Sequence, residues 1–181
     1  MKINNYLDST YLKTPQQSGL SEEETKEKVD ELTREAIENE FFEVMIRPNF
    51  VKEIKEYLLK NNSNVKVGTV IGFHEGTATI DEKYSEAQQA INDGADELDF
   101  VINYEAFKKG DLETPKQEFI KCTQLGLENG KVVKWIIEIA ALTDEQIVDL
   151  TKNIRIWAEE NFKAEDLPNI FVKSSTGFYP T

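Results

Sequence analysis

The chain has 181 residues, with 34 acidic side chains against 21 basic ones and a formal net charge of −13. This length can bury the core of one domain, so we treat residues 1–181 as a single domain. The negative charge disfavours contact with nucleic-acid phosphates and anionic lipid surfaces, and no stretch dense in Lys and Arg reverses it. We therefore expect neither a nucleic acid nor a membrane as partner.

The chain contains one cysteine, Cys122, and one histidine, His74. This count excludes a disulfide framework and argues against a Cys/His zinc site, so we expect no metal. The N-terminal segment has acidic and polar residues where a secretory signal needs an unbroken apolar run, and no later segment is long enough to span a bilayer. We expect a soluble, cytoplasmic protein.

Short runs of apolar and β-branched residues alternate with longer helical patterns. We predict six strands buried on both faces, at residues 5–12, 41–47, 64–73, 96–103, 131–140 and 169–175. Ser or Thr stands three residues before Glu or Gln, the spacing of a capping box, at residues 21–24, 114–117 and 143–146. Gly94 and Gly130 directly follow helical patterns and suit left-handed C-terminal caps.

Alternating strands and helices predict an α/β fold, either an open doubly wound sheet or a closed (β/α)8 barrel. The segment after the first strand, LDSTYLKTPQQSG, lacks the glycine spacing of a dinucleotide-binding sheet. Chemistry contributed by many strand ends is typical of the barrel, which the sequence therefore favours. The polar residues near the predicted strand ends are Asp8, Arg47, Asp99, Asn103, Lys134, Glu138 and Lys173.

Lys173 lies late in the apolar strand IFVKSS, where burial disfavours the charged form of an amine. If Lys134 on the neighbouring strand also points into the barrel, its charge lowers the pKa of Lys173 further. A neutral amine attacks carbonyl carbon, and the Schiff base formed permits carbon–carbon cleavage while Asp99 moves protons. Such chemistry needs no bound cofactor. Taken alone, Asp99 also fits a structural acid, and Lys134 fits a lysine that reaches to solvent.

Three other side chains are weaker candidates. His74, in the loop segment GFHEGTATID, is interpreted as lining a substrate pocket. Arg47, before Pro48, suits either a phosphate or an acid from the next loop. Cys122 is interpreted as a small packing residue on a helix.

Five segments resemble the deoxyribose-phosphate aldolase family, in order and over essentially the whole chain: LDSTYLK, VGTVIGF, GADELDFVIN, WIIEIAALTDEQI and FVKSSTGF. The resemblance implies a class I aldolase on a (β/α)8 barrel. It also implies reversible cleavage of 2-deoxy-D-ribose 5-phosphate to acetaldehyde and D-glyceraldehyde 3-phosphate, within deoxynucleoside breakdown. The expected partners are thus a small sugar phosphate and an aldehyde.

Carried over by position, the resemblance implies Lys173 as the Schiff-base nucleophile and Asp99 as the acid and base that transfers protons. It implies Lys134 as a second lysine lining the same site. The candidate substrate-binding residues are Asp8, Thr10, Arg47, Thr69, His74, Asn103, Glu138, Ser175 and Thr176.

The sequence departs from the family in three places. GFHEG stands where many members have GFP, and MIRPNF places Arg47 where a small polar residue is frequent, so aldehyde choice is expected to differ. Members also continue for roughly a third more sequence, which adds strands seven and eight, a second catalytic lysine and the phosphate loops. We therefore expect residues 1–181 to supply about the first six βα units of the barrel.

Two other functions stay open. A chain without those strands can be a non-catalytic aldolase-like protein that binds a sugar phosphate or a partner. A Schiff-base lyase for an unphosphorylated aldehyde is the other possibility. A homodimer is kept as the expected assembly, although no exposed strand or helix stripe marks an interface.

Overall fold

The computed structural model describes residues 3–180. Its six strands form one sheet, and their order in the sheet follows their order in the chain. Every neighbouring pair is parallel, as expected when a helix connects each strand to the next. The strands are β1 (Asp8–Tyr11), β2 (Glu43–Ile46), β3 (Lys66–Ile71), β4 (Glu97–Val101), β5 (Val132–Ile136) and β6 (Ile170–Lys173). Sequential order without a reversal is the winding of a (β/α)8 barrel and not of a doubly wound sheet.

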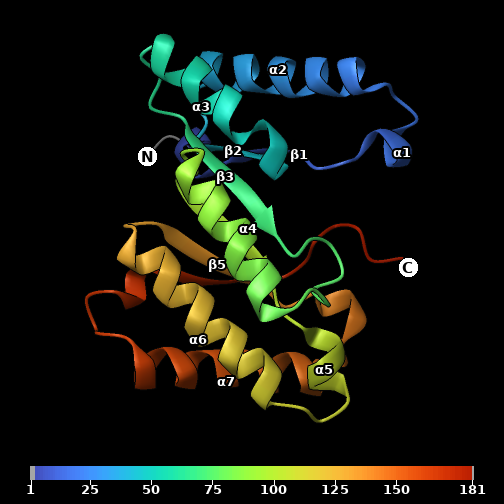
Figure 1. Ribbon diagram of the computed structural model, residues 1–181, viewed down its shortest axis with the longest axis vertical. Helices are drawn as coiled ribbons and strands as arrows, with labels where there is room; N and C mark the ends of the chain where they lie inside the picture. The colour runs from blue at the N-terminus through green and yellow to red at the C-terminus, as the bar shows by residue number, and fades with distance from the viewer. Residues whose placement is uncertain (1–2, 181) are drawn as a thin grey trace.

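The helices lie on the outer side of this curved sheet, with α2 and α3 at one end of the molecule and α6 and α7 at the other (Figure 1). The α-helices are α1 (Pro15–Ser18), α2 (Glu22–Glu38), α3 (Val51–Lys60), α4 (Ile80–Asn92), α5 (Tyr104–Lys108), α6 (Glu113–Glu128) and α7 (Asp144–Asn161). Short 3-10 helices are η1 (Ile3–Tyr6), η2 (Pro48–Phe50), η3 (Ile139–Ala141) and η4 (Leu167–Asn169). None of the helices within residues 3–180 combines the length and apolar character that crossing a bilayer requires.

Two of the three predicted capping boxes are confirmed. Ser21 caps α2 and Thr143 caps α7, each with both reciprocal hydrogen bonds. The prediction at residues 114–117 is wrong, because α6 already begins at Glu113. The carboxylate of Asp111 accepts the amide N–H groups of Glu113 and Thr114, so an aspartate satisfies the free donors of this helix end.

Two further capping boxes were missed although their spacing is present in the sequence. Thr14 caps α1 with Gln17, and Thr79 caps α4 with Glu82. The predicted glycines at the helix ends are confirmed, since Gly94 and Gly130 have φ of 99° and 67°. Such left-handed backbone favours glycine because it has no Cβ.

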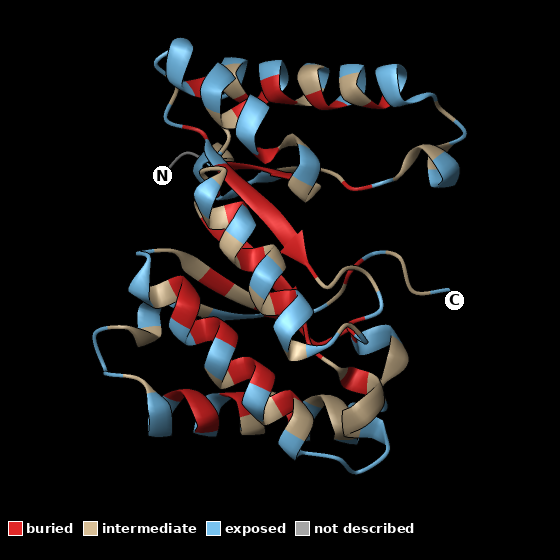
Figure 2. Cartoon of the chain, in the orientation of Figure 1, coloured by how far each residue is buried: buried red, intermediate tan, exposed pale blue. Residues whose placement is uncertain are grey.

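The main core lies between the sheet and the helices, where buried positions line the inner sides of the helices (Figure 2). Phe100 of β4 stacks on Trp135 of β5, with ring centroids 4.9 Å apart. Cys122 on α6 is fully buried, which confirms its packing role, and burial raises the pKa of its thiol to about 12.

Burial on both faces was predicted for all six strands, and this is wrong for β1 and β6. Their residues are all exposed or half-buried, whereas β2 and β4 are buried throughout. The physical reason is position: within residues 3–180, β1 and β6 form the two edges of the sheet, so each packs against one neighbouring strand only.

Candidate active site

The inner face of the sheet carries a cluster of charged side chains. Alternate residues of a strand point to the same face, so Glu97 and Asp99 of β4 share one face while Leu98 points to the helices. Gly68 of β3 identifies the inner face, because a Cβ there would lie 2.3 Å from Oε1 of Glu43. Only glycine leaves room for that carboxyl group.

Lys134 of β5 is the centre of this cluster. Its Nζ lies 2.5 Å from Glu97 Oε2, 3.3 Å from Glu43 Oε1, 3.4 Å from Asp99 Oδ1 and 3.8 Å from Asp8 Oδ2. Burial alone disfavours the ammonium form, but the neighbouring carboxylates, that of Asp99 first, outweigh it and raise the pKa of Lys134 above its ordinary value. Lys134 is therefore a fixed cation.

Asp99 joins the two lysines. Its side chain is fully buried, and Oδ2 accepts a hydrogen bond from Nζ of Lys173 at 2.6 Å. The other oxygen, Oδ1, faces Lys134. The side chain of Lys173 is 33% exposed and that of Lys134 is 14% exposed, so Lys173 is the amine that a substrate reaches more readily. The structure thus brings together all three residues predicted as catalytic.

Two acids of the cluster were missed in the sequence. Glu43 is fully buried, and burial raises its pKa to about 10, so it holds its proton at neutral pH. Glu97, which lies two residues before Asp99 on β4, also contacts Lys134. The available signal was an acidic residue within the apolar runs FFEVMIR and DELDFV. Asp8, which was predicted, is the first residue of edge strand β1, and burial raises its pKa as well.

Glu138 and Thr176 bind each other. The buried carboxylate of Glu138 accepts the backbone N–H of Thr176 at 3.0 Å and also the Thr176 hydroxyl. This contact holds the segment after β6, which includes half-buried Ser175, against the end of β5. Both residues thus shape the loop next to Lys173.

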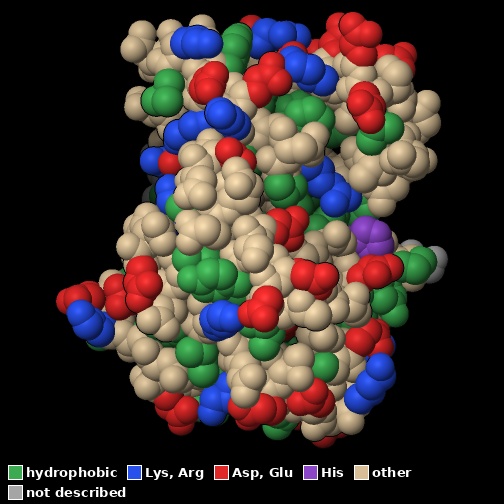
Figure 3. All heavy atoms as spheres, viewed as in Figure 1, with side chains coloured by type: hydrophobic (Ala, Val, Ile, Leu, Met, Phe, Trp, Pro, Cys, Tyr) green, Lys and Arg blue, Asp and Glu red, His purple; other side chains and the backbone are tan. Residues whose placement is uncertain are grey.

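His74 and Arg47 each contact the ring of a phenylalanine that follows a strand of the sheet. The imidazole of His74 stacks on the ring of Phe178, with centroids 5.7 Å apart. His74 is the only histidine in the sequence, and it is visible at the surface in Figure 3. The Arg47 guanidinium lies 4.7 Å from the centre of the Phe73 ring, and its Nε donates to the carbonyl of Leu12. His74 lines a cavity of about 370 Å³ formed by the loop between β3 and α4.

Two predicted substrate-binding residues lie elsewhere. Thr69 is adjacent to Val70, the register partner of Asp99, and therefore points to the helix side, where its hydroxyl donates to the carbonyl of Ile46 at 2.8 Å. Asn103 caps α5, because its Oδ1 accepts the N–H of Ala106. Neither side chain reaches the lysines. Thr10 lies on exposed edge strand β1, two residues after Asp8 and on the same face.

No group of three or more His, Cys, Asp or Glu side chains within residues 3–180 is arranged to hold a metal ion. The carboxyl groups that do converge surround an ammonium group. The arrangement can supply an accessible amine, a carboxylate in contact with it and a second, fixed positive charge.

Comparison with known proteins gives the family. The model of the DeoC/LacD family aldolases matches residues 8–157. Deoxyribose-phosphate aldolase of Lactiplantibacillus plantarum is 40% identical over 178 residues, which cover 98% of this chain and 74% of the relative. The corresponding enzyme of Thermococcus kodakarensis is 39% identical, with 98% and 71% covered.

Solved structures agree. A putative deoxyribose-phosphate aldolase from Coccidioides immitis superposes with a TM-score of 0.80 at 28% identity, over 99% of this chain and 64% of that one. The tetrameric deoxyribose phosphate aldolase of Aeropyrum pernix gives a TM-score of 0.76 at 27% identity, over 99% and 66%. The chain thus spans less than two thirds of the length of these two solved structures. The barrel-type fold and the aldolase resemblance are confirmed, and the chain belongs to the DeoC/LacD aldolase family.

Proposed function

We propose that this chain carries the Schiff-base site of a deoxyribose-phosphate aldolase, which reversibly cleaves 2-deoxy-D-ribose 5-phosphate to acetaldehyde and D-glyceraldehyde 3-phosphate. The observation that supports it best is the contact between Nζ of Lys173 and Oδ2 of Asp99, at 2.6 Å, in a member of an aldolase family. An amine next to a carboxylate can lose a proton, attack a carbonyl and regain it.

In the first half of the reaction, the neutral amine of Lys173 adds to C1 of the open-chain sugar. Asp99, which took up a proton from Lys173 when the amine became neutral, gives that proton to the carbonyl oxygen, and the added nitrogen then gives one up to Asp99 directly or through water. Asp99 then returns a proton to the hydroxyl group, which leaves as water, so an iminium ion remains. Lys134 holds the other oxygen of Asp99 throughout this exchange.

In the second half, a base removes the proton of the C3 hydroxyl and the C2–C3 bond breaks. Its electron pair moves to the iminium nitrogen, which gives an enamine, and D-glyceraldehyde 3-phosphate leaves. Protonation of C2 and addition of water to the iminium release acetaldehyde and restore the amine. Asp99 is the carboxylate placed for these proton transfers, since it is in contact with the reacting nitrogen.

Reductive trapping tests this proposal. Acetaldehyde and cyanoborohydride should attach an ethyl group to Lys173, identified by mass spectrometry of peptides, because cyanoborohydride reduces the iminium ion. Lys173→Met should lose the rapid adduct, whereas Lys163→Met, at a side chain 80% exposed, should retain it. An intact chain that forms no adduct at Lys173 contradicts the proposal.

Turnover of 2-deoxyribose compared with its 5-phosphate separates the proposed substrate from an unphosphorylated aldehyde. Preference for the phosphate supports the proposal, and equal turnover indicates a different Schiff-base lyase. A folded chain that forms no adduct and turns over neither sugar indicates the non-catalytic alternative.

The site of action and the assembly are also proposals. We place the reaction in the cytoplasm, where deoxynucleoside breakdown supplies the phosphorylated sugar. A homodimer stays a prediction, and the relative from Aeropyrum pernix is described as a tetramer. Light scattering on the purified chain measures the mass of the assembly and decides between a monomer, a dimer and a tetramer.

A further inference from the structure

A buried ion pair lies outside the lysine cluster. Lys83 of α4 and Glu118 of α6 have side chains that are 0% and 1% exposed, and Nζ of the lysine lies 2.6 Å from Oε2 of the glutamate. Burying two charges is costly, and apolar residues of similar volume often stabilise a fold equally well. The pair therefore calls for an explanation other than stability, and the reaction proposed above does not use it.

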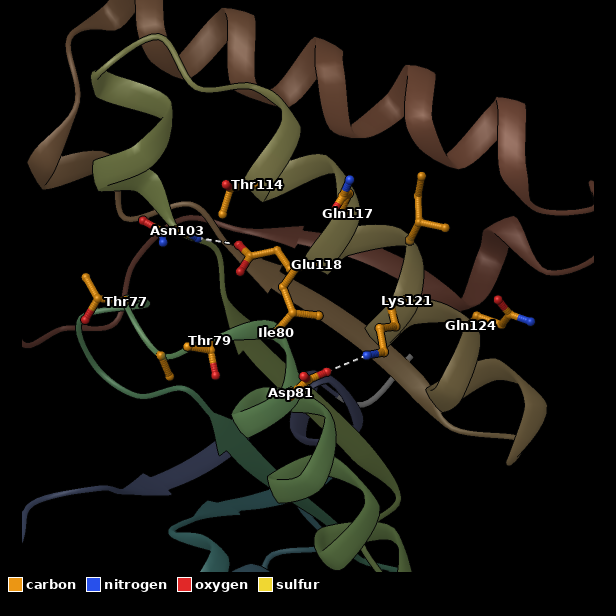
Figure 4. Close-up of a pocket in the computed structure, with 12 residues that line it drawn as sticks. Thr77, Thr79, Ile80, Asp81, Asn103, Thr114, Gln117, Glu118, Lys121 and Gln124 are labelled. Carbon is orange, nitrogen blue, oxygen red and sulfur yellow. Dashed lines mark hydrogen bonds and ion pairs between the residues drawn. The ribbon is translucent and has the colours of Figure 1, made fainter.

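The remaining hydrogen bonds of the pair show where it acts. Nζ of Lys83 also donates to the carbonyls of Gly76 and Val101, each at 2.8 Å. Oε1 of Glu118 accepts the backbone N–H of Asn103 at 2.5 Å, the contact drawn in Figure 4. Lys83 thus makes three hydrogen bonds and both oxygens of Glu118 accept one. Within residues 3–180, the other hydrogen-bond partners of the two side chains lie in the loop after β3 and at the end of β4.

The position of this ion pair is explained by the place where strand β3 ends. At Gly72, φ is 64°, and the chain turns away from the sheet while β4 continues. Since the N–H of Ile102 donates to Ile136 on β5, the carbonyl of Val101 points to the side where β3 has ended. A buried carbonyl needs a donor. Lys83 donates to this carbonyl at the place where β3 would donate if it continued.

The same contacts connect two parts of the proposed site. The loop between β3 and α4 carries Phe73 and His74, and both rings contact Phe178 after β6. Strand β4 carries Asp99, two residues before Val101. The loop lies directly on the end of β4, because a Cβ at Gly76 would be 2.3 Å from the carbonyl oxygen of Ile102.

We propose that Lys83 and Glu118 are positioning residues, whose ion pair fixes the loop of residues 72–79 on the end of β4 and so sets the rings of Phe73 and His74 relative to Asp99 and Lys173. The inference rests on the proposed function for its catalytic meaning. Its structural meaning, a loop held to a strand by two buried charges, is tested separately below.

A surface ion pair provides a matched control. Lys121 of α6 and Asp81 of α4 join the same two helices at 2.6 Å, but their side chains are 47% and 88% exposed (Figure 4). This pair contacts neither Gly76 nor Val101. If the buried pair only held α4 to α6, the two pairs would have the same kind of effect.

The first experiment compares two double variants, Lys83→Met with Glu118→Leu and Lys121→Met with Asp81→Ala. The buried replacement should unfold at a lower urea concentration than the parent, because the carbonyls of Gly76 and Val101 and the N–H of Asn103 lose their partners, so trapping is measured without urea on variants that circular dichroism shows to be folded. Its rate of trapping acetaldehyde at Lys173, at low aldehyde concentration, should fall about 100-fold, since a displacement of about 1 Å has that effect. The surface replacement should trap at the parental rate.

The second experiment needs neither activity nor a variant. In the parent chain, the amide protons of Asn103 and of Gly76, which donate to Glu118 and to the carbonyl of Gly72, should exchange with solvent in one shared opening event. Exchange of the Gly76 amide with a lower opening free energy than that of Asn103 overturns the proposal. A folded buried replacement that traps aldehyde at the parental rate also overturns it. If the parent itself forms no adduct, the proposed function fails, and the exchange result alone decides the positioning role.

Discussion

Nζ of Lys173 lies 2.6 Å from Oδ2 of Asp99, although 74 residues separate the two in the chain. Lys134 faces the other oxygen of the same carboxylate at 3.4 Å. One buried acid therefore holds two lysines of unequal exposure. The contacts favour different roles for the two amines: Lys173 can meet a substrate, while Lys134 is surrounded by carboxyl groups.

Asp99→Asn should keep the shape of the site and remove its proton carrier. We expect the rate of aldehyde trapping at Lys173 to fall by about 10² to 10⁴, the contribution of general acid–base catalysis. Trapping followed by mass spectrometry measures this rate. Asp96→Asn is the control, because Asp96 binds Lys55 and the N–H of Val67 away from the lysine cluster and should leave the rate unchanged. Equal rates for the parent and Asp99→Asn would contradict the role.

Lys134→Met should destabilise the fold strongly. Three of the carboxyl groups around its Nζ, on Glu43, Glu97 and Asp99, are between 0% and 6% exposed. Removing one partner of a buried ion pair costs about 3–5 kcal/mol, which urea unfolding measures. Lys163→Met, whose ion pair with Glu165 is highly exposed, should change stability by less than about 1 kcal/mol. A small effect at Lys134 would show that water screens the cluster.

Glu43→Gln should stabilise the protein relative to the parent, and this difference should increase as pH rises. The pKa of Glu43 is about 10 in the folded state and near 4.5 in an unfolded chain, so the folded state binds the extra proton between those values. Stability from this group is therefore complete below pH 4.5 and is lost as pH rises toward 10. Glutamine cannot lose a proton. The difference in unfolding free energy between variant and parent should thus grow from about pH 5 to about pH 9.

The other titratable groups of the lysine cluster do not disturb this comparison of the parent with Glu43→Gln. Lys134 has a raised pKa, so its contribution is constant below its unfolded value of 10.5 and does not alter the slope in this range. Glu97, Asp99, Asp8 and Lys173 are present in both proteins. Parallel stability curves for parent and variant would show that Glu43 is ionised in the folded state.

Gly68→Ala should destabilise the protein through a steric clash inside the barrel. The added Cβ would lie 2.3 Å from Oε1 of Glu43 and 2.5 Å from Cε of Met45, and overpacking of this kind costs about 1–3 kcal/mol. Adding Glu43→Ala to the same chain should recover the part of the loss that comes from Glu43, whereas the contact with Met45 remains. A double-mutant cycle by urea unfolding measures the coupling, and strictly additive effects would contradict the contact.

Much of the fold could be predicted from local sequence. Six strands occur within the predicted ranges, because their apolar runs are bounded by helix caps that obey short-range rules. The wrong prediction at residues 114–117 came from the same rules, since Asp111 competes with Thr114 for the same helix end. Thr69 and Asn103 were assigned to the site because they lie near strand ends, but strand pleating and a helix cap turn their side chains away from it.

The sequence by itself determined the strand and helix order, the three residues of the candidate catalytic cluster and the aldolase family, because these depend on short segments and their succession. Tertiary structure alone decided that Glu43 and Glu97 join the cluster, that Gly68 makes room for Glu43, and that Lys83 meets Glu118. Each of these contacts joins residues from different strands or helices. Their energy comes from burial of charge, and no local pattern reports which charges a fold will bury together.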